Sequence, residues 1–148
     1  MEWVERLRGT VVGVDSAPLI YFIEDDPVYG KRLSAFFEAV SSSRIRAVTS
    51  VVTLAEVLVR PLREGRVDLV RQYREILLTS TGFDTVPVSS EIADHAAQLR
   101  AAHGLRTPDA IQLATAMSAG ATAFLTNDTR LAKTARLEPL LLAELRDD

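Results

Sequence analysis

The chain has 148 residues, 47% of them hydrophobic, which is enough for one ordinary domain with a real core. It has no cysteine, which excludes cysteine-ligated zinc, iron–sulfur clusters and a thiol nucleophile. The formal net charge of −3 excludes a nucleic-acid-binding protein that is basic over its whole surface. Since no long apolar run predicts a membrane span and the N-terminus does not resemble a signal peptide, we expect a cytoplasmic protein without membrane contact.

Short runs rich in β-branched residues alternate with longer segments of helical periodicity. Strands are predicted at 10–14, 46–50, 84–88 and 122–126, with a further edge strand at 137–142. Helices are predicted at 16–24, 28–42, 52–63, 66–80, 90–103, 108–119 and 129–135. This alternation is typical of an α/β protein, and we predict a three-layer α/β/α sandwich with a central parallel sheet. Since no repeat or linker interrupts the pattern, residues 1–148 are expected to form a single domain.

Proline and glycine mark several of the expected helix ends. Pro18 falls in the first turn of the first helix, and Pro61 predicts that helix 52–63 stops or kinks there. Thr107 and Pro108 read as a cap followed by a first-turn proline. The helix at 16–24 is apolar around most of its circumference, so part of it is expected to form an interface with another protein.

Four carboxylates fall at or just past strand-to-helix junctions: Asp15, Glu56, Asp109 and Asp128. In parallel α/β sheets, ligands bind beyond the carboxyl ends of the strands, so these acids are the candidate catalytic and metal-binding residues. Carboxylates that converge repel one another unless a cation neutralises them, and hard oxygen ligands select Mg²⁺ or Mn²⁺. A site of this kind serves hydrolysis of phosphodiester bonds best.

Each acid also has an ordinary structural explanation. Asp15 and Asp128 can cap the helices that follow them, and Asp109 suits the positive end of a helix. Glu56 can be a solvated helix residue. These alternatives weaken when the acids are taken together, because a fold gains nothing from gathering like charges on one rim.

Polar residues next to the acids are candidates for a supporting role. Ser16, Thr53, Thr126 and Asn127 can orient the carboxylates or metal-bound waters, although local capping explains some of them equally well. Basic residues follow Glu56 along the same helix. Arg60 and Arg63 are candidates for binding RNA phosphates, with a solvated helix end as the alternative.

Four segments in this order, VDSAPLIYF, SVVTLAEVL, RTPDAIQLATA and LTNDTRL, resemble the PIN domain family, and in particular the VapC-type toxins of bacterial toxin–antitoxin pairs. The resemblance runs from about Val11 to the C-terminus, and TLAE and PDAIQLATA are its most specific parts. It implies a Mg²⁺- or Mn²⁺-dependent endoribonuclease in which Asp15, Glu56 and Asp109 match the core acids and Asp128 the more variable fourth. It also implies a homodimer, and a small antitoxin whose C-terminal tail blocks the site.

Other functions remain open at the level of sequence. One is a PIN-like RNA-processing nuclease without an antitoxin, and another is a non-catalytic α/β binding module. A receiver or phosphatase domain also holds acids at strand ends, but Ala17 stands where a paired-aspartate phosphatase needs its second acid.

Overall fold

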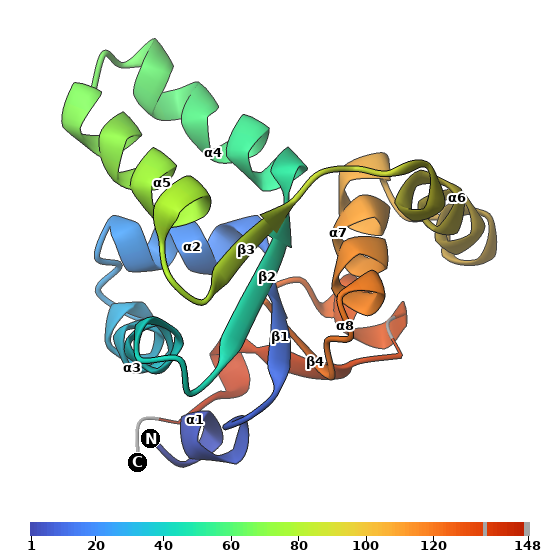
Figure 1. Cartoon of the computed structure of the whole chain (residues 1–148), viewed down its shortest axis with the longest axis horizontal. Coiled ribbons are helices and arrows are strands. Elements are labelled where there is room, and N and C mark those ends of the chain that lie inside the picture. The colour runs from blue at the N-terminus through green and yellow to red at the C-terminus, as the bar shows by residue number, and fades with distance from the viewer. Residues whose placement is uncertain (135, 147–148) are drawn as a thin grey trace.

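The computed structural model describes residues 1–134 and 136–146. Its strands are β1 (Val11–Val14), β2 (Arg46–Ser50), β3 (Phe83–Val86), β4 (Ala123–Thr126) and β5 (Glu138–Leu141). All pairings are parallel, and the strands lie in the order β3-β2-β1-β4-β5, so β1 is central and β5 forms an edge (Figure 1). The predicted parallel sheet and its further edge strand are confirmed.

Helices cover both faces of this sheet. They are α1 (Glu2–Arg6), α2 (Ser16–Ile23), α3 (Gly30–Ser41), α4 (Val51–Arg63), α5 (Val67–Thr79), α6 (Ser90–His103), α7 (Thr107–Ser118) and α8 (Thr129–Thr134), followed by a 3-10 turn at Leu142–Glu144. Side chains of α1 to α5 pack in one hydrophobic cluster, and those of α6 to α8 pack in a second cluster. The predicted three-layer α/β/α sandwich is therefore confirmed. No helix within the described residues is both long and apolar enough to cross a bilayer.

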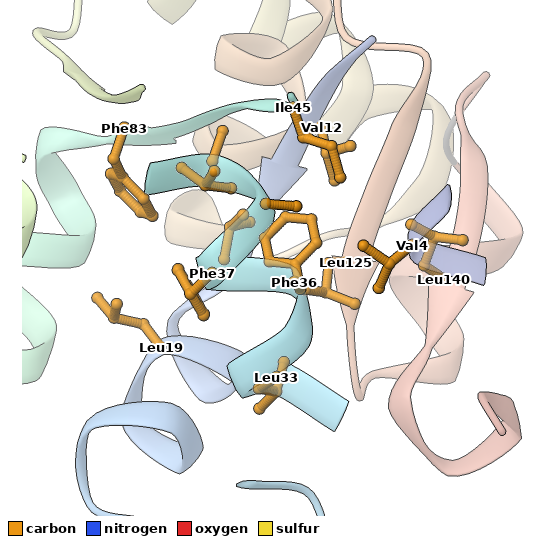
Figure 2. Packing of buried hydrophobic residues seen from close by; sticks show 14 of the residues in the cluster. Val4, Val12, Leu19, Leu33, Phe36, Phe37, Ile45, Phe83, Leu125 and Leu140 are labelled. Atoms are coloured by element: carbon orange, nitrogen blue, oxygen red, sulfur yellow. The ribbon is translucent and has the colours of Figure 1, made fainter. Parts of the chain in front are cut away.

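The larger cluster surrounds the two phenylalanines of α3. Phe36 is fully buried, and its ring meets that of Phe37 edge to face with centroids 5.2 Å apart. Figure 2 shows these rings among side chains from α1, α2 and the strands. Successive side chains of a strand point to opposite faces of the sheet, and on β1 Val12 and Val14 point into this cluster.

Gly13, which lies between those two valines, faces α7. A Cβ atom at this position would lie 2.6 Å from the Cβ of Ala116 and 2.7 Å from Cδ1 of Phe124, closer than carbon atoms approach. The missing side chain therefore lets α7 lie directly against β1. This contact brings the first turn of α7 to the same end of the sheet as the residue that follows β1.

Two predictions about the elements need correction. Pro61 was predicted to stop or kink the helix at 52–63, and the stop is wrong, because α4 continues through this buried proline to Arg63. The N-terminal lead, for which no element was predicted, forms α1. Its residues Trp3, Val4 and Leu7 are buried, and the ring of Trp3 stacks on Phe36 at 6.0 Å between centroids.

Candidate active site

The four predicted acids line one open cavity of about 460 Å³ at the carboxyl ends of the strands. Asp15 directly follows β1, Asp128 follows β4, Glu56 lies in the second turn of α4 after β2, and Asp109 lies in the first turn of α7. The full lining is Asp15, Ser16, Ala17, Tyr21, Glu56, Arg106, Asp109, Asn127, Asp128 and Thr129. Acids that are distant in sequence thus share one space.

Asp15 caps α2 while its carboxylate faces the cavity. One oxygen, Oδ1, accepts a hydrogen bond from the backbone N–H of Ser16 at 2.8 Å, and Oδ2 accepts one from Thr126 Oγ1 at 2.7 Å. Burial still raises the pKa of Asp15 above its ordinary value, and the charges of Asp109 and Asp128 add to the rise. Asp15 therefore caps α2, as its structural explanation predicts, and also contributes its carboxylate to the cavity.

Glu56 also lines the cavity and is more exposed than Asp15. Ser16 Oγ donates a hydrogen bond to its Oε1 at 3.1 Å, which joins α2 to α4. Partial desolvation raises the pKa of Glu56, with the charges of Asp15 and Asp109 acting in the same direction. A carboxylate that is poorly solvated and close to other acids gains more than usual from a nearby cation.

Asp109 is the most buried of the four acids, with 8% of its surface exposed. Its Oδ2 accepts a hydrogen bond from Arg106 Nε at 3.1 Å, and Arg106 occupies the N-cap position of α7. Thr107, expected as the cap, is the first helical residue instead. Among the described residues no hydroxyl group caps this helix, and the guanidinium group of Arg106 neutralises Asp109 in its first turn.

Asp128 has an arginine partner as well. Arg130 Nη2 lies 3.2 Å from Asp128 Oδ2, and the backbone N–H of Arg130 donates to Oδ1 at 2.9 Å. The side-chain hydrogen bond from Arg130 is the main reason why the pKa of Asp128 lies below its ordinary value. Thr126 Oγ1, which donates to Asp15, also accepts a hydrogen bond from the N–H of Asp128 at 3.0 Å. One hydroxyl thus links these two acids.

A buried polar network behind the cavity joins α7 to the β2–α4 junction. Gln112, one turn after Asp109, accepts hydrogen bonds from the Ser50 N–H and from Thr49 Oγ1, both at 3.2 Å. Its amide group donates to Thr53, whose hydroxyl lies 2.6 Å from that of Thr49. Because every member is hydrogen-bonded, this network fixes the register of α7 against α4, and therefore of Asp109 against Glu56.

The supporting residues predicted from sequence divide into two groups. Ser16 and Thr126 bond directly to the acids, and Asn127 lines the cavity. Thr53 is fully buried and is hydrogen-bonded to Thr49 and Gln112, so any support that it gives to the acids passes through this network. Arg60 and Arg63 do not line the cavity, and Arg60 pairs with Glu64 at 3.3 Å.

Three residues that bond to the acids or to the network behind them were not singled out from the sequence. Gln112 follows Asp109 at helical spacing, and a polar residue inside the apolar segment DAIQLATA was the available signal. Arg106 and Arg130 are each within three residues of an acid. In a chain rich in arginine, that proximity alone does not distinguish them from other surface charges.

The donor set suits a hard divalent cation, because every candidate ligand is a carboxylate oxygen. Over residues 1–134 and 136–146, however, no three acidic or histidine side chains are grouped closely enough to hold an ion as they stand. Asp109 and Asp128 instead direct oxygens towards guanidinium groups. The residues therefore fit Mg²⁺ or Mn²⁺ by type, and holding an ion requires the carboxylates to move closer together.

Comparison with known families agrees with this architecture. Residues 12–137 match the PIN domain over most of the chain. The chain belongs to the PIN domain family. This family generally consists of nucleases. No curated protein sequence matches the chain.

Solved structures share the fold of this PIN domain at low sequence identity. VapBC2 from Rickettsia felis, bound to a DNA fragment from its promoter, gives a TM-score of 0.69 at 14% identity and covers 87% of this chain and 96% of that chain. FitAcB from Neisseria gonorrhoeae gives a TM-score of 0.62 at 21% identity and covers 91% of this chain and 99% of that chain. A toxin–antitoxin complex from Klebsiella pneumoniae gives a TM-score of 0.59 at 24% identity and covers 84% of this chain and 90% of that chain. These similarities show the fold.

Proposed function

We propose that this PIN domain is a Mg²⁺- or Mn²⁺-dependent endoribonuclease and the toxin of a type II toxin–antitoxin pair. The observation that carries the nuclease proposal is the meeting of Asp15, Glu56, Asp109 and Asp128 in one cavity at the carboxyl ends of the strands. Four acids gathered in one cavity with two arginine partners remain costly to a fold unless they bind a cation. The known activity of the family supports the same reading.

The side chains take separate roles in this proposal. Asp15, Glu56, Asp109 and Asp128 would hold the cation, which when bound lowers the pKa of a water molecule and stabilises charge on the phosphate. Ser16 and Thr126 fix the carboxylates by donating hydrogen bonds to Glu56 and Asp15. The open mouth of the cavity leaves room for an extended strand, and single-stranded RNA is the substrate that we propose.

The test is the substitution Asp109→Asn, which removes one charge without changing the shape of the side chain. We expect it to lower both Mn²⁺ affinity, measured by calorimetry, and RNA cleavage by about a hundredfold or more. Asp68→Asn is the matched control, because Asp68 also begins a helix and pairs with an arginine three residues away, but lies outside the cavity. Equal cleavage by the two variants would contradict the proposal.

The toxin proposal rests on the neighbouring structures, which include toxin–antitoxin complexes. An antitoxin needs an apolar surface, and a hollow of about 350 Å³ between α2, α3, α5 and β3 offers one, lined among others by Phe22, Phe37, Ile76 and Phe83. We further propose that the chain forms a homodimer.

The antitoxin is tested by co-expression. Co-expression with the product of the adjacent reading frame should give a stable complex without ribonuclease activity. A fully active enzyme after co-expression would favour the RNA-processing nuclease that acts without an antitoxin.

A non-catalytic binding module is the remaining alternative. It predicts RNA binding that is unchanged by EDTA and by Asp109→Asn. The complete set of acids in the cavity favours the enzyme over this module.

A further inference from the structure

Two arginines are each paired with an acid of the cavity, and Arg106 also lines the cavity itself. Arg106 binds Asp109 through Nε and Nη2, at 3.1 and 3.5 Å. Arg130 binds Asp128 through Nη2 and Nε, at 3.2 and 3.4 Å. The arginine side chains are 68% and 71% exposed, whereas those of their partners are 12% and 30% exposed. The guanidinium groups therefore lie on the solvent side of carboxylates that face inwards.

The electrostatic influence of these arginines reaches beyond their own partners to three of the four acids. Arg106 interacts electrostatically with Glu56 and Asp128 as well as with Asp109, and Arg130 interacts with Asp109. Within the described residues, Asp15 and Glu56 form no ion pair of their own. Arg106 and Arg130 are thus the counter-charges that offset repulsion among the four acids.

A divalent cation and the arginines compete for the negative charge of the same carboxylates. A guanidinium group bonded to Asp109 or Asp128 occupies lone pairs of that carboxylate and repels a cation that approaches it. An arginine displaced from a carboxylate stays charged and keeps five N–H donors. Phosphate is the ligand that its planar, forked geometry fits best.

We propose that Arg106 and Arg130 are exchangeable counter-ions, which neutralise Asp109 and Asp128 in the metal-free protein and turn to the backbone phosphates of single-stranded RNA when the acids bind a divalent cation. This inference rests on the proposed function and adds substrate-binding residues and an order of events to it. Both side chains are largely exposed, so they can change partner without disturbing the core.

The proposal predicts opposite effects on two ligands. Arg106→Gln and Arg130→Gln each remove a competitor for the carboxylates, so Mn²⁺ affinity, measured by calorimetry without RNA, should rise about two- to fivefold for each variant. Affinity for a fluorescent single-stranded RNA with Mn²⁺ present should fall about tenfold in the double variant. The slope of log affinity against log salt should also fall, by about 0.7 for each arginine. Anisotropy is measured with a cleavage-resistant RNA analogue, so that all four acids remain available to the cation.

Two further variants separate this role from a structural one. Arg71→Gln breaks an exposed ion pair of the same spacing, Arg71 with Asp68 at 3.3 Å, outside the cavity, and should change neither affinity. Arg106→Lys keeps the charge but loses the forked donors, so Mn²⁺ affinity should stay near that of the unmodified protein while RNA affinity falls.

The outcomes distinguish the exchange of arginine partners from the proposed nuclease function. Mn²⁺ affinity that is unchanged or lower in the double variant would overturn the exchange. Unchanged RNA affinity would overturn it as well. If the unmodified protein bound no Mn²⁺ at all, the proposed nuclease function would fail, and this inference with it.

Discussion

Asp15 accepts two hydrogen bonds, yet burial and neighbouring acids raise the pKa of its carboxyl. Folding therefore favours the protonated form of this side chain. The stability that it contributes is fully present below the ordinary pKa of 3.8 and is lost as the pH rises through the raised value. At neutral pH the ionised carboxylate is a cost to the fold, as is common for residues retained for function.

We therefore expect Asp15→Asn to stabilise the metal-free protein. At neutral pH in EDTA, the free energy of unfolding should rise by about 1 kcal/mol, which is about 2–4 °C in Tm for a chain of this size. The gain should shrink as the pH falls towards the ordinary carboxyl range. Thermal denaturation of both proteins across this range measures it, and a variant that is less stable at neutral pH would contradict the electrostatic reading.

The acids of the cavity could be predicted from the sequence, and their arginine partners could not. Asp15 comes directly after an apolar strand and Asp128 comes two residues after one, so their position at the sheet edge follows from local order. The guanidinium group of Arg106 bonds to Asp109. This contact depends on the rotamer of an exposed side chain, which no sequence pattern predicts. Thr53 has the right spacing to Glu56, but its side chain points to Gln112.

Among the elements, the contact between α7 and β1 determines where Asp109 lies. It depends on Gly13, where a Cβ atom would collide with Ala116 and Phe124. We expect Gly13→Ala to destabilise the protein by about 1–3 kcal/mol, since overpacking forces side chains or backbone to shift. Denaturant unfolding measures the loss. A shift of α7 also moves Asp109, so Mn²⁺ affinity should fall as well.

A second-site variant tests this cause. Ala116→Gly removes the nearer of the two obstacles, so the double variant Gly13→Ala/Ala116→Gly should lose less stability than the two single losses added together. Strict additivity would mean that the collision with Ala116 is not the source of the effect.

The elements themselves were predictable where periodicity is local. Strand and helix positions follow from apolar spacing, and α6 begins and ends at the predicted residues. Pro61 does not end its helix as predicted. It removes one hydrogen bond, to the carbonyl of Val57, but only two residues of α4 follow it and its ring is buried. The five-residue α1 was missed because a helix this short is stabilised by tertiary contacts rather than by its own sequence.

At the scale of the whole molecule, α1 completes the larger core. Trp3 is 7% exposed and stacks on Phe36. We expect Trp3→Ala to cost about 3 kcal/mol of unfolding free energy, the usual loss for a large buried aromatic side chain. Since this is the only tryptophan, unfolding of the variant is followed by circular dichroism.

Trp3→Phe provides the comparison. The indole Nε1 is buried without a hydrogen-bond partner among the described residues, so phenylalanine removes an unsatisfied donor while keeping most of the apolar contact. Its loss should be well below that of Trp3→Ala. Equal losses would mean that α1 depends on the indole in particular rather than on apolar burial.

The strand order joins elements that are distant in the chain, β1 with β4 for example, and local patterns did not specify it. The homodimer and the single domain over residues 1–148 stay predictions, because a single chain without partners tests neither.

The position of α1 makes Trp3 a fluorescent reporter that is independent of a paramagnetic ion bound among the acids. The helix lies at the start of β1, at the end of the sheet opposite the first turns of α4 and α7 (Figure 1). Indole emission from Trp3 therefore follows unfolding from a place remote from the acids. Paramagnetic Mn²⁺ held among those acids should leave this emission almost unquenched, so any strong quenching in a titration would expose ions that had settled elsewhere on the surface.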